Sequence, residues 1–326
     1  MFRKLLVPLD RSPLAEQAVG QAAAIAKRAN AGIDLVLVHQ PTAIDGLSDD
    51  QWYGEQWKDE VKYLESIAKE IETGSNIVAT FSAPEGDVIK EICERAVEVD
   101  ADLIVITSHG RTGLSRAWLG SIADGVMRHA KMPVLMLRPV EVKTGEHVSH
   151  GMFKHVLITL DGSSLSEEIL SPALALAKAE GARITLLRVV QPVPMVLPDS
   201  GIIASYSPSI PDTGATQTLV DEAKAQLTIT ANGVSAQGFE VDAHVMVSSH
   251  VANAIIDFSV THGVDLVALS THGRGASRFV MGSVADKVIR ASGLPVLLQR
   301  PVGVRNVVRL AADPMSVAES PALAHV

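Results

Sequence analysis

Disulfide bonds and membrane anchors are the first features that this sequence lacks. Its single cysteine, Cys93, excludes an internal disulfide framework of the kind found in secreted domains. No stretch approaches the roughly 18 uninterrupted apolar residues that a membrane-spanning helix needs. The apolar run at 5–9 ends at Asp10 and is too short for a signal peptide. We therefore expect a cytoplasmic protein with no membrane partner.

Positive charge and aromatic side chains are also scarce. The 28 Lys and Arg are outnumbered by 37 Asp and Glu, which gives a net charge of -9. This balance opposes a phosphate backbone, so we expect no nucleic-acid partner. Aromatic residues make up 4% of the chain and hydrophobic residues 47%, so aliphatic side chains must fill the cores. With 326 residues, the chain is long enough for two domains.

What the chain does contain is an internal repeat. Residues 3–12 recur as 153–163, and Asp10 corresponds to Asp161. Three further segments recur in the same order: 101–111 as 264–274, 120–124 as 282–286, and 132–135 as 294–297. These matches predict one domain at 1–140 and a second at 152–302, joined by a polar linker at 141–151. The tail, 303–326, has no counterpart in the first half.

Each repeat alternates short β-branched and Leu-rich runs with longer helical patterns, which is typical of βαβ units. The predicted strands are 4–9, 33–39, 77–81, 103–107 and 134–137, then 155–160, 183–190, 239–247, 265–270 and 295–299. Ser12 is expected to cap a helix that begins at Pro13, and Ser164 with Glu167 has the spacing of a capping box. The predicted fold class is α/β, with two repeated domains that each hold a five-stranded parallel sheet with helices on both faces.

A ligand of such a sheet is expected at the carboxyl ends of the strands. The first strand leads to Asp10, and the fourth leads into the glycine-containing stretch 110–116, followed by Gly120, Ser121 and a helix. Glycines allow close approach of the backbone to an anion, and a helix N-terminus adds its positive dipole end. Arg111 can supply a cation, while Asp10 can accept a hydrogen bond from an adenine amino group or a ribose hydroxyl. The same spacing would also suit a tight turn with surface arginines.

At these residues both repeats resemble the universal stress protein family, over nearly all of 1–302. ATP-binding members of that family carry Gly-x2-Gly-x9-Gly-(Ser/Thr), an Asp after the first strand and an aliphatic residue ending the second. The first repeat matches this pattern at Asp10, Val38, Gly110, Gly120 and Ser121, with Thr107 in place of the leading glycine. A β-branched residue there resists the backbone conformations open to glycine.

The resemblance implies which residues hold a nucleotide. In repeat 1 it assigns the base and ribose to Pro8, Leu9, Asp10, Val38, Ile106 and Thr107, and the phosphates to Gly110, Gly120, Ser121 and Ile122, with Arg111 beside them. In repeat 2 the equivalent residues are Leu160, Asp161, Val189, Leu269, Ser270, Gly273, Gly282, Ser283 and Val284. Eight residues separate Gly273 from Gly282, one fewer than in repeat 1, so we expect the second site to bind less readily.

Other chemistries lack their motifs. No G-x-G-x-x-G follows the first strand and no G-x-x-x-x-G-K-(S/T) occurs, so NAD binding and a P-loop NTPase are not expected. Asp10 as a phosphotransfer nucleophile would lack a second acid, because Ser12 stands two positions later. His147, His150 and His155 surround the linker without a ligand set that closes a metal shell, and we expect them to be solvated. No metal site is expected from the protein alone.

The resulting hypothesis is a stress-response protein that binds ATP, with or without Mg²⁺, or a related adenine nucleotide, mainly in repeat 1. No base is paired with a nucleophile, so we expect no catalytic residue and slow or absent hydrolysis. His109 and His272 are expected to fix the loop entrance by hydrogen bonds. The alternative is a nucleotide-independent scaffold. In either case the last strands of the repeats are expected to pair within the chain, and the whole chain to form a homodimer.

Overall fold

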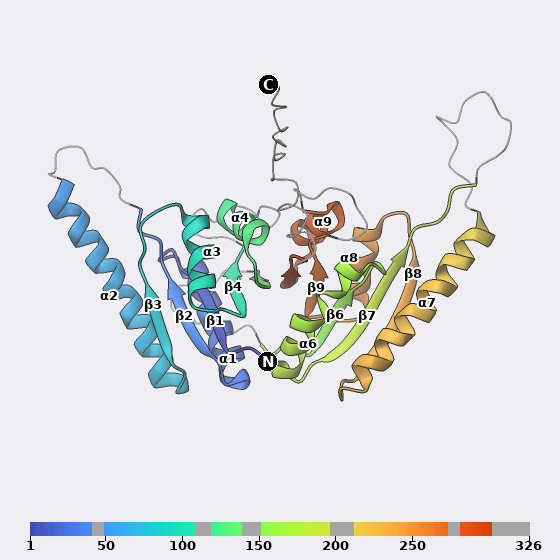
Figure 1. The fold of residues 1–326 in the computed structure, drawn as a ribbon, viewed down its shortest axis with the longest axis horizontal. Helices are drawn as coiled ribbons and strands as arrows, with labels where there is room; N and C mark the ends of the chain where they lie inside the picture. Colours follow the sequence, from blue (N-terminus) through green and yellow to red (C-terminus); the bar gives the residue numbers. More distant parts are fainter. Residues whose placement is uncertain (41–48, 109–118, 139–150, 196–211, 273–280, 302–326) are drawn as a thin grey trace, which may run out of the picture.

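The computed structural model describes residues 1–40, 49–108, 119–138, 151–195, 212–272 and 281–301. Two similar halves lie side by side, with the long helices α2 and α7 on their outer sides (Figure 1). The first half holds β1 (Lys4–Pro8), α1 (Pro13–Ala29), β2 (Gly32–Val36), α2 (Asp49–Ser75), β3 (Ala79–Ser82), α3 (Val88–Glu98), β4 (Leu103–Thr107), α4 (Ser121–His129) and β5 (Val134–Leu137).

The second half repeats this order with one extra helical turn. It holds β6 (His155–Thr159), α5 (Ser164–Glu167), α6 (Leu170–Glu180), β7 (Arg183–Val190), α7 (Thr213–Ser235), β8 (Val241–Val247), α8 (Val251–Thr261), β9 (Leu266–Ser270), α9 (Ser283–Ala291) and β10 (Val296–Gln299). The predicted strands are therefore confirmed, with ends that differ by at most three residues.

The strands of the described residues form one ten-stranded sheet in the order β3-β2-β1-β4-β5-β10-β9-β6-β7-β8. Within each half all neighbouring strands are parallel, which confirms the predicted α/β fold class. The halves meet at the centre, where Leu297 of β10 stands opposite Leu135 of β5 in an antiparallel register. A doubly wound sheet thus continues from one repeat into the other.

Helices cover both faces of the sheet and enclose two apolar cores. One core gathers Ile25 of α1, Leu64 of α2 and Leu176 of α6 against the strands. The other gathers Ile92 of α3 and Val126 of α4, together with their counterparts on α8 and α9. Alternate residues of each strand point to opposite faces, so β5 at the centre of the sheet, which is buried along its whole length, is apolar on both sides.

Local capping follows the sequence in repeat 1 and differs in repeat 2. Ser12 Oγ accepts from the Ala15 N–H at 3.1 Å, as predicted, and Pro13 begins the helix. In repeat 2 the predicted cap Ser164 is wrong, because Ser163 has the extended backbone of a cap and accepts from the Ser166 N–H. Ser163 corresponds to Ser12 when the two repeats are aligned, so the alignment would have predicted Ser163 as the cap.

The linker histidines also need one correction. His155 is not solvated; it is buried at the start of β6, with Nε2 2.8 Å from the Thr185 hydroxyl. Burial, followed by the nearby Arg183 charge, lowers the pKa of His155. His147 and His150 lie outside the described residues. None of the helices in the described ranges is both long and apolar enough to cross a membrane.

Candidate nucleotide sites

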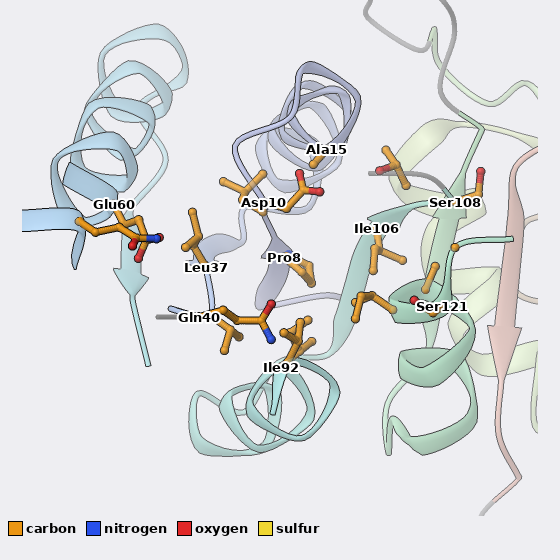
Figure 2. A pocket seen from close by; sticks show the side chains of 18 residues that line it. Pro8, Asp10, Ala15, Leu37, Gln40, Glu60, Ile92, Ile106, Ser108 and Ser121 are labelled. Atoms are coloured by element: carbon orange, nitrogen blue, oxygen red, sulfur yellow. The ribbon is translucent and has the colours of Figure 1, made fainter. Parts of the chain in front are cut away.

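A cavity of about 380 Å³ opens at the carboxyl ends of β1, β2 and β4 in repeat 1 (Figure 2). It is lined by all nine of the candidate residues of repeat 1 that the structure describes: Pro8, Leu9, Asp10, Val38, Ile106, Thr107, Gly120, Ser121 and Ile122. Gly110 and Arg111 lie outside the described residues, as does His109. Residues separated by more than 100 positions are thus brought to one site.

Asp10 is oriented by the turn that follows β1. The Leu9 N–H still donates to the Val36 carbonyl, so the strand pairing continues to the edge of the cavity. Asp10 Oδ1 then accepts from the Ser12 N–H at 3.0 Å, and Arg11 adopts a left-handed φ of 65° between them. This turn holds a half-buried carboxylate at the rim, where it can accept a further hydrogen bond from a ligand.

The opposite side of the cavity is the start of α4. The Gly120 N–H donates to the Ser108 carbonyl at 2.8 Å, which ties the beginning of the helix to the end of β4. Gly120 is the N-cap and provides no side-chain cap hydrogen bond. The first N–H groups of α4 and the Ser121 hydroxyl therefore remain available at the cavity, an arrangement that suits phosphate oxygens.

The middle of the cavity is apolar. Its lining includes Pro8 of β1, Leu37 directly after β2, Val88 and Ile92 of α3, and Ile106 of β4. An aromatic base buries readily between such side chains, while its polar edge needs hydrogen-bonding partners.

Four polar lining residues escaped sequence analysis: Gln40, Gln56, Glu60 and Ser108. Glu60 lies on α2, four residues before the buried Leu64, and its side chain is 4% exposed. An acid on the apolar stripe of an amphipathic helix is a signal that the sequence contains. No motif indicated which cavity that stripe would meet.

Repeat 2 has a corresponding cavity of about 1110 Å³. It is lined by the eight described candidate residues of that repeat: Leu160, Asp161, Val189, Leu269, Ser270, Gly282, Ser283 and Val284. Gly273 lies outside the described residues. The helix start is built as in repeat 1, because the Gly282 N–H donates to the Thr271 carbonyl at 2.8 Å. His272 Nδ1 lies 2.9 Å from the Thr271 hydroxyl at this position.

The turn after β6 also has the form of its counterpart after β1. Asp161 Oδ1 accepts from the Ser163 N–H at 2.8 Å, and Gly162 takes the left-handed φ of 83° that Arg11 adopts in repeat 1. The guanidinium of Arg188 lies against this glycine, so close that a Cβ at Gly162 would be 2.6 Å from its central carbon. Arg188 also donates to Gln226. A cation therefore lies beneath the turn in repeat 2, where repeat 1 has the apolar Leu37.

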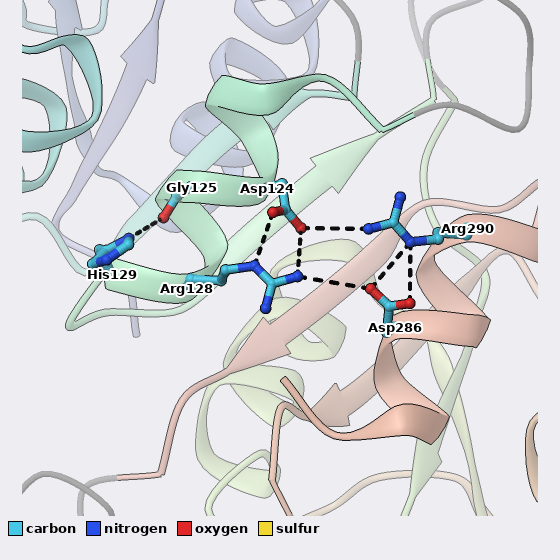
Figure 3. A network of polar contacts seen from close by, with 6 residues as sticks. All are labelled: Asp124, Gly125, Arg128, His129, Asp286 and Arg290. Carbon is cyan, nitrogen blue, oxygen red and sulfur yellow. Dashed lines mark hydrogen bonds and ion pairs between the residues drawn. The ribbon is translucent and has the colours of Figure 1, made fainter. Parts of the chain in front are cut away.

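Two more arginines line this second cavity at the boundary between the repeats, Arg128 of α4 and Arg290 of α9 (Figure 3). Arg128 donates two hydrogen bonds to Asp124, at 2.8 and 3.0 Å, and lies 3.8 Å from Asp286. Arg290 repeats this pattern with Asp286 at 3.1 Å and Asp124 at 3.8 Å. The hydrogen bond to Asp124 raises the pKa of Arg128. Repeat 1 thus contributes a side chain to the cavity of repeat 2.

The described residues contain no group of three or more His, Cys, Asp or Glu that could hold a metal ion. Any divalent ion at either cavity would therefore need ligands from a bound phosphate as well as from the protein.

A profile of the universal stress protein family matches residues 1–138 and 152–300. The chain belongs to the universal stress protein family. It is 30% identical over 141 residues to universal stress protein MJ0531 of Methanocaldococcus jannaschii, which covers 42% of this chain and 83% of that protein. It is 26% identical over 205 residues to universal stress protein Mb2028c of Mycobacterium bovis, 62% of each chain.

The tandem arrangement also occurs among solved structures. A universal stress protein from Archaeoglobus fulgidus superimposes with a TM-score of 0.67 at 22% identity, covering 91% of this chain and 98% of that one. Likeness at this identity establishes the shared fold, and the chemistry of the two cavities must be argued from their own residues.

Proposed function

We propose that this universal stress protein binds ATP or a related adenine nucleotide as a regulatory ligand, mainly in repeat 1. The observation that carries the proposal is the first cavity, which brings nine candidate residues together around apolar walls. The open start of α4 would take the phosphates, and Asp10 would accept a hydrogen bond from the ribose or base. Mg²⁺ would enter with the phosphates.

The ligand would act as a switch. In the described lining of the first cavity, the carboxylates are those of Asp10, which follows β1, and Glu60, which lies on α2. The phosphates are assigned to the start of α4. No acid or histidine of that lining lies on α4, so we propose slow or absent hydrolysis. A nucleotide bound without turnover stabilises the conformation or assembly that binds it best. We propose a cytoplasmic homodimer as that assembly.

The second candidate function is a nucleotide-independent scaffold. Thr107 supports it, since a buried β-branched side chain stands where ATP-binding relatives have a glycine. The antiparallel pairing of β5 and β10 supports it as well, because a continuous sheet holds the two repeats in a fixed relation whether or not a nucleotide is present.

The deciding experiment is a calorimetric titration of the nucleotide-free full chain with ATP and Mg²⁺, repeated for two matched variants, Gly120→Val and Gly282→Val. Both glycines have φ near −60°, a conformation open to any residue, so each valine blocks the helix start without straining φ. A Cβ at Gly282 would lie 3.1 Å from the Thr271 carbonyl oxygen, so thermal melts of both variants accompany the titrations. We expect Gly120→Val to weaken ATP binding by about tenfold or more and Gly282→Val to change it less. Absence of saturable binding by the unaltered chain would favour the scaffold.

A further inference from the structure

His39 and Glu60 form a buried pair at the outer end of the first cavity. The His39 Nδ1 donates to Glu60 Oε2 at 2.7 Å, and the two side chains are 5% and 4% exposed. The His39 backbone is fixed as well, because its N–H donates to the Pro84 carbonyl at 2.7 Å. Burial of a carboxylate is unfavourable unless hydrogen bonds compensate, so this contact holds Glu60 in one orientation.

Glu60 also faces the cavity, together with Gln56 from the preceding turn of α2. Glu60 Oε1 accepts from Gln56 Nε2 at 3.4 Å, which is long for a hydrogen bond to a carboxylate. A carboxylate has about four acceptor positions, so Glu60 can take a further donor from a molecule in the cavity.

The sheet order determines which part of a nucleotide would reach Glu60. His39 follows β2, Asp10 follows β1, and Gly120 is tied to the end of β4; these three strands are adjacent in that order. Two strand spacings, about 10 Å, separate β2 from β4. In Figure 2, Glu60 and Ser121 lie at opposite ends of the cavity, with Asp10 between them. With phosphates at α4, the ribose meets Asp10 and the base extends toward Glu60.

Repeat 2 shows that the fold does not need this pair. The buried Leu64 and Leu227 correspond on α2 and α7, which aligns Glu60 with Ala223 and Gln56 with Leu219. His39 aligns with Val190, and in repeat 2 Val190 and Ala223 pack in one small apolar cluster. The positions of the pair are therefore polar in repeat 1 and apolar in repeat 2, so the fold alone does not account for the pair in repeat 1.

We propose that Glu60, held in place by His39, accepts a hydrogen bond from the 6-amino group of the purine in the first cavity and so selects amino-purine over oxo-purine nucleotides. This assignment rests on the proposed nucleotide site. Glu60 is the contact residue and His39 a positioning residue. An oxo group at position 6 would place a second acceptor against the carboxylate oxygen that the amino group contacts, so that contact would lose its hydrogen bond.

The test compares ATP with inosine triphosphate, which differs by a 6-oxo group, and with GTP. The double variant His39→Val/Glu60→Ala copies the Val190 and Ala223 wall that the fold already accommodates in repeat 2. Glu65→Ala, an exposed acid on the same helix, is the control. We expect the unaltered chain and the control to prefer ATP by about tenfold or more, and the double variant to bind ATP and inosine triphosphate equally.

A third variant, Glu60→Gln, keeps the shape of the side chain and supplies an amide donor. It should raise the affinity for inosine triphosphate relative to ATP, so the proposal remains testable even if the double variant fails to fold. ATP binding without a preference over inosine triphosphate or GTP, or a preference that survives in the double variant, would overturn the role of Glu60 and leave the nucleotide site standing. No ATP binding by the unaltered chain would overturn both.

Discussion

The two cavities are built on the same backbone and differ in the charged side chains that line them. Each lies between an aspartate turn after the first strand and a helix start tied to the end of the fourth. The described lining of the first cavity carries the carboxylates of Asp10 and Glu60 and no arginine or lysine. The described lining of the second carries the carboxylates of Asp161 and Asp286 and, in addition, three arginines, of which Arg188 is 8% exposed.

The two repeats thus share the backbone of the cavity but differ in the polarity of the side chains that line it. Leu37, directly after β2, and Arg188 of β7 are equivalent positions that both line their cavities, and Arg188 lies against the aspartate turn of repeat 2. A buried cation there favours a ligand with negative charge near the turn, whereas an apolar side chain favours a neutral ribose or base. The two cavities are therefore expected to differ in ligand preference and not only in affinity.

The largest predicted effect comes from removing one partner of the pair that distinguishes the first cavity. His39→Val leaves Glu60 buried with its main hydrogen-bond donor gone, and we expect a loss of folding stability on the order of 3 kcal/mol. Chemical denaturation monitored by circular dichroism would measure it.

The double variant His39→Val/Glu60→Ala is the control for this loss. It removes the buried carboxylate as well, so it should be more stable than His39→Val alone, even though it carries one substitution more. If His39→Val is as stable as the unaltered chain, the hydrogen bond from His39 to Glu60 does not contribute to the free energy of unfolding, which would contradict this prediction.

A smaller effect is predicted at the boundary of the repeats. Glu180 of α6 is buried and pairs with Arg28 of α1, and it also accepts from the Phe153 N–H. In the alignment of the two repeats, Glu180 corresponds to Ala29 and Arg28 to Ala179. Neither alanine carries a charge, so this ion pair has no counterpart related by the repeat. Burial raises the pKa of Glu180, against the opposing effect of Arg28.

The sign of the pH dependence follows from that shift. Because the pKa of Glu180 is higher in the folded chain, its contribution to stability is full below the ordinary carboxyl range and is lost as the pH rises through the folded pKa. Glu180→Gln removes the titrating group and should therefore remove this slope, so the variant gains relative to the unaltered chain as pH increases. Its single amide oxygen can accept only one of the two hydrogen bonds, so the comparison rests on the slope and not on absolute stability. Thermal melts at pH 4 to 8 would measure the difference, and parallel curves would contradict it.

The strands and most residues of the two sites could be predicted from the sequence, because each residue of one repeat can be compared with its counterpart in the other. Asp10 with Asp161 and Gly120 with Gly282 were found in this way, and all described members of both candidate sets line their cavities. Glu60 and Arg188 were missed for the same reason. Each is polar in one repeat and apolar in the other, so comparison of the repeats hides it. Their roles depend on the packing of α2 on β2 and of α7 on β7, which no local motif encodes.

The smallest predicted effect concerns the ion-pair cluster of α4 and α9, to which the two repeats contribute equivalent residues. Asp124 and Asp286 occupy matching positions in the four-charge cluster of α4 and α9, each with one close arginine and one at 3.8 Å. Since these side chains are partly exposed, Asp124→Ala and Asp286→Ala should each cost less than about 1 kcal/mol, by similar amounts, and the cost should shrink at high salt. Denaturation at low and high salt would measure both. A much larger loss for Asp286→Ala would mean that the arginine-lined cavity depends on this cluster in a way that the first cavity does not, because Arg128 and Arg290 both line the second cavity.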